Sequence, residues 1–182
     1  GGFTGGYIYA ARRGLPTGVL ADITAPAMVL AMAVGRIGDI INGEHVSRTT
    51  SMPWGIIWSH PKSLTFQKYG LTPTHPAVVY ELLWDIATFC VLWFVLRGRL
   101  RPNGMLFAAF LAMYAFGRFF ISFFREDRTW ALSLTEAQWI SIIVLAITVP
   151  LLAYRAKMVP RQEEGTGTPT RAAMQRRAQK AR

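Results

Sequence analysis

The chain carries two arginines inside segments that are otherwise apolar enough for a lipid bilayer. Arg36 follows the apolar run of residues 23–33 and precedes Asp39 by three positions, and Arg118 stands within residues 104–124. A charge at membrane depth is costly and usually faces a partner or a wet cavity. The planar fork of arginine pairs with phosphate through two parallel hydrogen bonds. Because the phosphate available at this depth belongs to a phospholipid, these arginines predict a site for an anionic lipid headgroup.

Other polar residues are spaced so that they could join this site. On the segment that contains Arg118, polar side chains follow one another at steps of 4, 4 and 3, which places them on one helix face. These residues are Tyr114, Arg118, Ser122 and Arg125. The start of another apolar segment carries His75, Tyr80 and Glu81, and the segment with Arg36 is followed by Asn42, Glu44, His45 and Arg48. We expect all of these groups to meet at one end of a helix bundle.

Each candidate also has an ordinary structural interpretation. Arg36 could form a purely structural ion pair with Asp39 or with Glu81, and the sequence leaves this alternative open. Arg125 could equally be an interfacial anchor beside the two acidic residues that follow it. The histidines do not have the spacing of metal ligands, so we expect neither a metal nor a cofactor.

The elements that would position these residues are membrane-spanning helices. The chain is 52% hydrophobic and only 16% charged, against about 25% charge in soluble domains. A helix needs roughly 20 apolar residues to cross a bilayer. The segments that qualify are residues 21–41, 76–96, 104–124 and 135–154, and residues 1–11 resemble the end of a further span. The sequence therefore predicts an all-α integral membrane protein, a bundle of about four full transmembrane helices plus one partial N-terminal span, with a partly irregular outer loop.

Local signals mark the ends of these helices. Thr135 and Gln138 have the Thr-x-x-Gln spacing of a capping box before an apolar run. Pro76 suits the first turn of its helix. The sequence RPNG at residues 101–104 predicts a tight turn that makes the flanking spans an antiparallel hairpin. Residues 54–58 alternate Trp and Ile around small or apolar neighbours, which predicts a short strand at the membrane surface.

Basic residues in the short loops predict the direction of the bundle. Alternate crossings place three basic groups on the same side, which the excess of Lys and Arg in cytoplasmic loops identifies as the cytoplasmic side. The groups are Arg12 with Arg13, then Arg97, Arg99 and Arg101, then Arg155 with Lys157. The loops 43–75 and 125–133, and with them the predicted site, would then face the outer leaflet.

Residues 159–182 differ from the rest of the chain. They are basic, almost without apolar side chains, and rich in Gly, Pro, Thr and Gln, which predicts a disordered cytoplasmic tail after a membrane domain at residues 1–158. The chain has 20 Lys+Arg against 10 Asp+Glu, but much of this excess lies in the tail. Because nucleic-acid binding needs a folded basic surface that faces water, the sequence argues against a nucleic-acid partner.

A transporter or channel subunit is a further alternative, in which Arg36 and Arg118 would line a path for anions. Such a path predicts polar stripes through the full depth of the membrane. The inner halves of two spans, TFCVLWFVL and GMLFAAFLA, are instead apolar. The polar residues therefore favour a site open to one leaflet.

The segment GRIGDIINGEHVSR at residues 35–48 resembles the signature of the prolipoprotein diacylglyceryl transferase family. The family pattern reads roughly Gly-Arg-x-Gly-Asn-Phe-x-Asn-Gly-Glu, followed shortly by Gly-Arg. The matching residues are Arg36, Gly38, Asn42, Gly43, Glu44 and Arg48. Four more segments resemble family motifs in the same order, namely SMPWGIIW, THPAVVYE, YAFGRFFISFFRE and LSLTEAQWISI. The resemblance covers about residues 1–155.

This resemblance implies a multi-pass enzyme of the bacterial inner (plasma) membrane. It implies that the diacylglyceryl group of phosphatidylglycerol moves to the lipobox cysteine of a prolipoprotein signal peptide, with a thioether formed and glycerol phosphate released. The catalytic candidates are then Arg36, Glu44, Arg118 and Tyr114. The candidates for phospholipid binding are Arg36, Asp39, Asn42, Arg118, Arg125, His75 and Glu81. A thiol with its ordinary pKa of about 8.5 also needs a base or a positive field to become a thiolate.

The chain departs from the family pattern at several positions. Asp39 stands where the family has Asn, Ser47 where it has Gly, and Ser122 where it has Glu. The histidine that the family uses as a base would lie just before Gly1, so we expect an N-terminal portion to precede this chain. These departures keep a second hypothesis open, a divergent or truncated non-catalytic membrane protein that binds anionic phospholipid.

Overall fold

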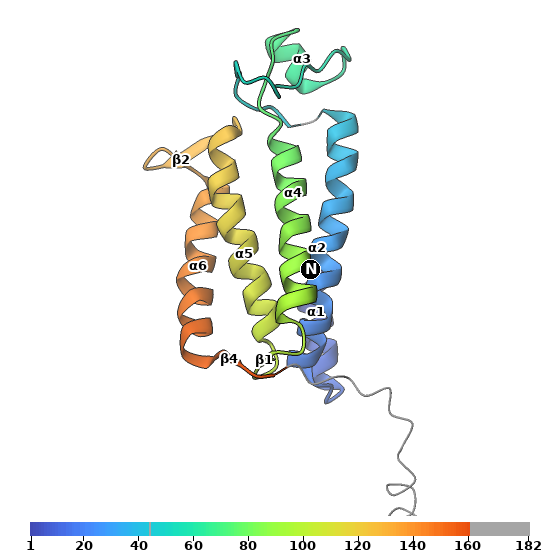
Figure 1. The fold of residues 1–182 in the computed structure, drawn as a ribbon, viewed down its shortest axis with the longest axis vertical. Helices are drawn as coiled ribbons and strands as arrows, with labels where there is room; N and C mark the ends of the chain where they lie inside the picture. The colour runs from blue at the N-terminus through green and yellow to red at the C-terminus, as the bar shows by residue number, and fades with distance from the viewer. Residues whose placement is uncertain (44, 161–182) are drawn as a thin grey trace, which may run out of the picture.

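A computed structural model describes residues 1–43 and 45–160 as a bundle of long helices (Figure 1). The helices are α1 (Gly2–Arg12), α2 (Thr17–Asn42), α3 (Leu64–Tyr69), α4 (Ala77–Cys90) with a π-helical continuation at Val91–Leu96, α5 (Met105–Ile121) with a 3-10 turn at Ser122–Phe124, and α6 (Glu136–Arg155). The short strands form two antiparallel pairs, β1 (Leu100–Arg101) with β4 (Lys157–Met158) and β2 (Thr129–Ala131) with β3 (Leu134–Thr135).

Among the residues described, four helices are long and apolar enough to cross a membrane. They are Thr17–Asn42, Ala77–Leu96, Met105–Phe124 and Glu136–Arg155. The predicted spans agree closely with these, the largest difference being a first helix that begins at Thr17 rather than at residue 21. The predicted all-α integral membrane bundle is thus confirmed, and α1, with 11 residues, is the short N-terminal helix beside it.

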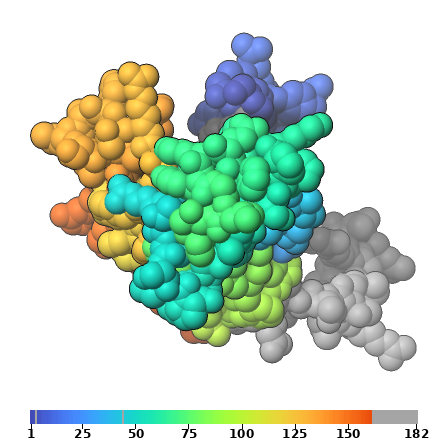
Figure 2. All heavy atoms as spheres, turned by 90° about the horizontal axis from the view of Figure 1, so that it is seen from above, coloured from blue at the N-terminus to red at the C-terminus, as the bar shows by residue number. Residues whose placement is uncertain are grey.

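The four long helices stand side by side, with α5 between α4 and α6 and with α2 beside α4 (Figure 1). We call the end of the bundle that carries α3 the outer end, and the end that carries β1 and β4 the inner end. The loop that contains α3 lies across the outer end, as the view from above shows (Figure 2). The β1–β4 pair joins the turn after α4 to the end of α6, which brings the predicted basic loops to the same end of the molecule.

The apolar core lies toward the inner half of the bundle. Val29 and Leu92 are fully buried, and Phe110 of α5 packs in the same cluster. The start of α5 is held there by Asp22 of α2, whose carboxylate accepts hydrogen bonds from the backbone N–H groups of Gly104, at 2.7 Å, and Phe107, at 3.0 Å. The first N–H groups of a helix have no partner within it, so this carboxylate from a neighbouring helix serves as the cap of α5.

The predicted helix-end signals are largely confirmed. The Thr135 hydroxyl accepts a hydrogen bond from the backbone N–H of Gln138 at 3.3 Å, and the Gln138 side-chain oxygen accepts one from the backbone N–H of Thr135 at 2.9 Å. This reciprocal pair is the predicted capping box of α6. Residues 101–104 form the predicted turn, and Gly104 ends it with a φ of +97°, which favours glycine.

The predicted surface strand at residues 54–58 is wrong. A turn closed by the Gly55 N–H on the Met52 carbonyl at 3.0 Å interrupts the segment, and only an isolated bridge links Ile56 to Thr74. The alternation of large side chains instead reflects a loop that lies on the helix ends. Trp54 uses its indole N–H to donate to the Tyr80 hydroxyl at 2.8 Å, which fastens this loop to the start of α4.

The chain enters the outer loop through a tight left-handed residue. Gly43 has a φ of +61°, and a Cβ added to it would lie 2.6 Å from the hydroxyl of Ser63. That hydroxyl donates to the Gly43 carbonyl at 3.0 Å and so ties the end of α2 to the start of α3. Glycine is required here both by the backbone conformation and by the close approach of the loop.

Candidate functional site

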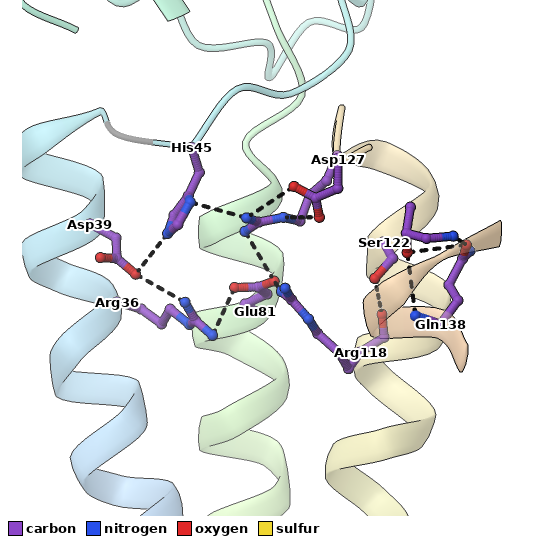
Figure 3. A network of polar contacts seen from close by, with 10 residues as sticks. Arg36, Asp39, His45, Glu81, Arg118, Ser122, Asp127 and Gln138 are labelled. Carbon is purple, nitrogen blue, oxygen red and sulfur yellow. Dashed lines mark hydrogen bonds and ion pairs between the residues drawn. The ribbon is translucent and has the colours of Figure 1, made fainter. Parts of the chain in front are cut away.

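Three spans bring charged side chains together near the outer end of the bundle (Figure 3). Glu81 of α4 is at the centre, with only 4% of its surface exposed. Arg36 of α2 places its Nη2 atom 3.0 Å from the Glu81 Oε2 atom, and Arg118 of α5 donates from Nη1 to Glu81 Oε1. The structure therefore brings together, on one carboxylate, the arginines that the sequence placed on separate spans.

These contacts continue into a closed ring of five side chains, which we call the ionic ring: Arg36, Glu81, Arg125, His45 and Asp39. Arg125 Nη1 lies 3.4 Å from Glu81 Oε1, and its Nη2 lies 3.0 Å from His45 Nδ1. His45 Nε2 lies 3.5 Å from Asp39 Oδ2, which accepts from Arg36 Nη1 at 2.9 Å. Because an arginine can only donate, His45 Nδ1 is the acceptor in its contact with Arg125.

The charges within and beside the ionic ring balance. The guanidinium groups of Arg36, Arg118 and Arg125 face the carboxylates of Glu81 and Asp39, and Asp127 Oδ2 accepts from Arg125 Nε at 3.0 Å. Both alternatives for the ion pair of Arg36, with Asp39 and with Glu81, are present at once. Buried charges are costly unless they are paired, so this arrangement lets three arginines lie close together without a ligand.

Arg125 is not a water-facing anchor. Its side chain is only 6% exposed, and each of its nitrogen atoms contacts a ring residue or Asp127. The loop after α2 fixes its backbone through a bridge between Ser47 and Arg125, flanked by hydrogen bonds from Arg48 N to Phe124 O at 3.0 Å and from Glu126 N to Val46 O at 3.1 Å. This pairing carries the end of the signature segment onto the end of α5.

The site contains buried polar atoms without a hydrogen-bond partner in the described part of the chain. They are Arg36 Nε, Glu81 Oε2, which has only its ion-pair contact with Arg36, and, one and two turns farther inward along α4, Asp85 Oδ2 and the Thr88 hydroxyl. A small cavity of about 10 Å³, bordered by Arg36, Tyr114 and Arg118 among others, lies beside these atoms. Buried polar groups are almost always satisfied, so these atoms indicate room for a water or for a polar group of a ligand.

The remaining predicted residues lie at different distances from the ionic ring. Tyr114 borders the small cavity, and its ring is 6.3 Å from that of Phe110. Asn42 is exposed at the last position of α2. Glu44 lies outside the described residues. Ser122, at the family's glutamate position, is buried and donates its hydroxyl to the Arg118 carbonyl at 2.6 Å.

His75 belongs to an aromatic cluster rather than to the ionic ring. Its Nδ1 atom lies 3.4 Å from the Tyr80 hydroxyl, and its ring centre lies 5.0 Å from that of Phe124. Tyr80 and Phe124 are also in contact, with ring centres 5.5 Å apart. The cluster packs the start of α4 against the end of α5, so His75 supports the wall of the site from the outside.

The sequence reasoning missed His45 and Asp127 as partners of Arg125. The sequence places His45 among the polar residues expected at the outer end, but its spacing does not identify Arg125 as its partner. Asp127 was treated only as one of the acids near Arg125. Its contact could have been expected from the two-residue separation, since a short acidic side chain can reach back to a buried arginine.

Comparison with known proteins adds a second line of support. A model of the prolipoprotein diacylglyceryl transferase family matches residues 1–154. The chain is 35% identical over 162 residues to a phosphatidylglycerol–prolipoprotein diacylglyceryl transferase of Geobacter sulfurreducens, covering 84% of the chain and 58% of that protein. It is also 35% identical over 150 residues to the protein of the same name from Ligilactobacillus salivarius, covering 81% of the chain and 56% of that protein. To the protein of the same name from Mycobacterium tuberculosis it is 35% identical over 137 residues, covering 69% of the chain and 29% of that protein. The chain thus spans about half the length, or less, of these relatives.

Proposed function

The chain belongs to the prolipoprotein diacylglyceryl transferase family, and from this we propose that it forms the lipid-phosphate site of such an enzyme. The proposed reaction moves the diacylglyceryl group of phosphatidylglycerol to the lipobox cysteine thiol of a bacterial prolipoprotein. The observation that carries the proposal is the convergence of Arg36, Arg118 and Arg125 on Glu81 near the outer ends of three membrane spans. Arginines that already share one carboxylate are placed to share a phosphate.

In the proposed mechanism the phosphate of phosphatidylglycerol takes over the ionic contacts that Arg36 and Arg118 now make with Glu81. The cysteine sulfur, as thiolate, attacks the glycerol carbon that bears the phosphate ester. The carbon–oxygen bond breaks, both electrons go to the phosphate oxygen, and a thioether and glycerol phosphate result. The arginine donors stabilise the charge that develops on the departing oxygen. The thiol proton goes to the histidine that the resemblance assigns to a position before Gly1.

Each of the other predicted residues has a role in this proposal. Glu81 keeps the arginines apart from one another and oriented when no lipid is bound. Asp39 holds Arg36 from the side opposite to Glu81, with contacts of 2.9 Å and 3.0 Å on the two Nη atoms. Tyr114 faces the small cavity from α5. Glu44, Asn42 and His75 stay candidates for orienting the lipid at the outer edge of the site.

The proposed setting is the inner membrane of a bacterium, with the site toward the outer leaflet. The basic residues support this direction, since Arg12, Arg97 and Arg155 lie at helix ends near the β1–β4 pair. Arg97 stacks its guanidinium on the Trp93 ring, 4.0 Å from the ring centre, as basic and aromatic side chains do at membrane surfaces. The tail at residues 159–182, most of it outside the described residues, would then be cytoplasmic.

A second function is favoured by one observation. The ionic ring is neutralised by the chain's own carboxylates, and Asp39 adds one where the family pattern has Asn. A carboxylate beside the phosphate site slows a reaction that builds negative charge there. The alternative is therefore a non-catalytic relative that binds anionic phospholipid without transferring its diacylglyceryl group.

The experiment is a transfer assay in liposomes that contain phosphatidylglycerol and a peptide with a lipobox cysteine. Mass spectrometry detects the diacylglyceryl-modified peptide, for this chain and for its form extended at the N-terminus. Arg36→Ala should reduce transfer by about 10²–10³-fold, as loss of one charge-stabilising donor does, while the helix content stays unchanged. Arg12→Ala, which removes an exposed arginine at the inner end, is the matched control.

The outcomes separate the two functions. Product that depends on Arg36 supports the transferase. Full activity of the Arg36→Ala variant would refute the phosphate role of that residue. Product from neither form of the chain, together with retained binding of phosphatidylglycerol, would replace the transferase by the non-catalytic lipid-binding protein.

A further inference from the structure

Besides the small cavity beside the ionic ring, the described chain has a wider cleft on the outer side of the bundle. It has a volume of about 580 Å³ and lies between the loop after α2, the end of α5 and the β2–β3 hairpin. In the view from above, this hairpin stands at one edge, beside the loop that covers the helix ends (Figure 2). We call this cleft the outer pocket. Its volume is that of a site for a small molecule.

Arg48 is the distinctive cation of the outer pocket. Its side chain is exposed in the pocket wall, and it makes no hydrogen bond or ion pair with the residues that the structure describes. Its backbone, in contrast, is fixed on both sides, by the Phe124 carbonyl at 3.0 Å and by the His75 N–H at 2.9 Å. The other arginine of the wall, Arg125, is already paired. A positioned arginine without a contact partner is the group in this wall that can take an anion.

Two carboxylates also line the outer pocket, and both already have cation partners. Glu126 accepts a hydrogen bond from the Tyr69 hydroxyl and lies 2.9 Å from Lys68 Nζ. These two contacts, with a smaller contribution from the charge of Arg48, hold the pKa of Glu126 below its ordinary value. Asp127 is paired with Arg125 at 3.0 Å. The positive charge of Arg48 is therefore not cancelled by a direct contact in the pocket, while the carboxylate oxygens can still accept hydrogen bonds from hydroxyl groups.

The rest of the wall is lined by neutral groups that form hydrogen bonds. Thr49 contributes an exposed hydroxyl, and Gln138 contributes an amide. The hydroxyls of Ser122 and Thr135 belong to the same wall and already donate, to the Arg118 carbonyl at 2.6 Å and to the Gln138 amide oxygen at 3.3 Å, so they can act there only as acceptors. The capping box uses the oxygen of this amide, and its nitrogen has no partner among the described residues. A wall with one available cation, neutralised carboxylates and several hydroxyl and amide groups matches a ligand with one anionic end and one polyhydroxyl end.

We propose that the outer pocket binds a glycerol phosphate group, with Arg48 on the phosphate and the hydroxyl, amide and carboxylate groups on the glycerol hydroxyls. Two sources have this chemistry, the headgroup of phosphatidylglycerol before transfer and free glycerol phosphate after it, and naming them as substrate and product rests on the proposed function. Arg125 connects the two sites, since it lines the outer pocket and lies 3.4 Å from Glu81. Arg125 therefore borders both the ionic ring and the outer pocket.

A headgroup with an ammonium end, such as phosphoethanolamine, fits this pocket less well. An ammonium group would need an ion pair with Glu126 or Asp127, but these carboxylates are already paired with Lys68 and Arg125. A glycerol hydroxyl can donate to a free lone pair of either carboxylate without displacing those cations. The pocket should therefore prefer glycerol phosphate to phosphoethanolamine.

The test measures binding, without any need for transfer. The chain in phosphate-free detergent is titrated calorimetrically with sn-glycerol 1-phosphate, with phosphoethanolamine and with inorganic phosphate. A second arm measures binding of the chain to short-chain phosphatidylglycerol in micelles. Arg48→Gln should weaken the binding of glycerol phosphate by about tenfold or more, the loss expected for a charge-assisted contact. Arg128→Gln, which removes an exposed arginine outside this pocket, should leave it unchanged.

A second variant tests the glycerol end. Thr49→Val removes a hydroxyl from the exposed pocket wall with little change in shape, so the fold is not at risk. It should weaken the binding of glycerol phosphate while leaving the binding of inorganic phosphate unchanged. Tightening, or equal weakening of both ligands, would show that the wall does not recognise the glycerol.

The two arms also identify the source of the ligand. Weakening by Arg48→Gln in the soluble arm identifies a site for the released product, and weakening in the lipid arm alone identifies a headgroup site; both support the proposal. No difference between Arg48→Gln and Arg128→Gln in either arm, or tighter binding of phosphoethanolamine, overturns it. A chain that fails the transfer assay but keeps binding that depends on Arg48 would refute the proposed function and not this pocket.

Discussion

The two ends of the bundle use membrane-depth carboxylates in opposite ways. At the inner end, the Asp22 carboxylate accepts hydrogen bonds from the backbone N–H groups of Gly104 and Phe107, at 2.7 Å and 3.0 Å. At the outer end, the Glu81 carboxylate forms ion pairs with the side chains of Arg36 and Arg118. A backbone donor cannot leave without unwinding a helix turn, whereas an arginine can exchange one anion for another. The inner carboxylate is thus part of the scaffold, and in the proposed function the outer one occupies the place of the lipid phosphate.

The packing around the two carboxylates follows the same division. Val29, Leu92 and Phe110 form an apolar core in the inner half. In the outer half, the ionic ring takes the place of such a core, and unpartnered polar atoms remain at Arg36 and Asp85. Replacing buried ion pairs by apolar side chains is often neutral or stabilising. The ring is therefore better explained by binding than by stability, and this contrast can be tested.

The largest effect is expected for Glu81→Ala. The change leaves Arg36, Arg118 and Arg125 facing one another around an empty centre, and removal of one partner from a buried ion pair costs about 3–5 kcal/mol. The free energy of unfolding in mixed micelles measures this loss. Added phosphatidylglycerol should restore part of it, because the lipid phosphate supplies the missing negative charge. Glu136→Ala, at an exposed carboxylate, should cost less than about 1 kcal/mol.

A smaller effect, and no rescue, is expected for Asp22→Ala. The change removes two charge-assisted hydrogen bonds at the start of α5, which together stabilise the fold by about 2–3 kcal/mol. Unfolding in the same micelles measures the cost. Because the partners are backbone N–H groups away from the ionic ring, phosphatidylglycerol should not restore stability. Rescue of Asp22→Ala to the same extent as Glu81→Ala would remove the distinction between the two ends.

The sequence predicted the scaffold better than it predicted the pairing of charges. Span limits follow from the length of apolar runs, and the capping box of α6 follows from local spacing, so both were predictable. The contact of Arg125 with His45 was not, because it depends on the bridge between Ser47 and Arg125, which joins segments far apart in the chain. The outer pocket was not predictable for the same reason, since three separate segments form its wall.

The charged residues illustrate this limit most clearly. The sequence showed that Arg36 had two possible acidic partners, and it could not show that both would be used at once. It placed Arg48 at the end of the signature segment and could not distinguish it from the arginines that the fold neutralises. A helical period predicts which residues share a face, but the partner across the interface depends on how the helices are rotated and offset.

A still smaller effect is expected where α4 and α5 touch beside the site. A Cβ added to Gly117 would overlap with the indole nitrogen of Trp84, which donates to the Met113 carbonyl at 2.9 Å. Gly117→Ala must therefore displace the indole, at a cost of about 1–2 kcal/mol in the free energy of unfolding. Gly38→Ala is the matched control, because nothing lies within 4 Å of its added Cβ. Alanine there should be neutral or stabilising by up to about 1 kcal/mol, as its helix propensity is higher.

The difference between these two glycines tests the rigidity of the contact between α4 and α5. If Gly117→Ala is as stable as Gly38→Ala, the indole of Trp84 moves freely and does not fix the distance between the helices. If the variant is destabilised but binds phosphatidylglycerol as well as the parent chain, the contact serves the scaffold alone. Weaker binding would instead mean that Trp84 positions the neighbouring Glu81.

The smallest effect is expected for a carboxylate of a third kind, which belongs to neither end's interior. Glu126 is half-exposed at the outer surface, where its contacts with Tyr69 and Lys68 tie α3 to the end of α5. Those contacts lower the pKa of Glu126 and raise the pKa values of Tyr69 and Lys68. Because the pKa of Glu126 is lowered in the folded protein, its ionised carboxylate stabilises the docked loop at pH values above the ordinary glutamate pKa. This contribution is lost as the pH falls through the pKa of Glu126 in the folded protein. The raised values of the other two act in the opposite sense, and their contribution is lost at strongly alkaline pH.

We therefore expect α3 to be best protected around neutral pH and to loosen on acidification to pH values below about 4, the ordinary range of glutamate. Amide hydrogen exchange of residues 64–69, corrected for the intrinsic effect of pH, measures this protection. Glu126→Gln should remove the acid-dependent part of the change, and Glu136→Gln should leave it intact. Because these groups are exposed, water and salt screen their attraction, so the helices of the bundle should show no matching change. If residues 64–69 of the Glu126→Gln variant still lose protection at acidic pH, the pH response does not come from Glu126. It would then be assigned to the ionic ring rather than to the surface loop.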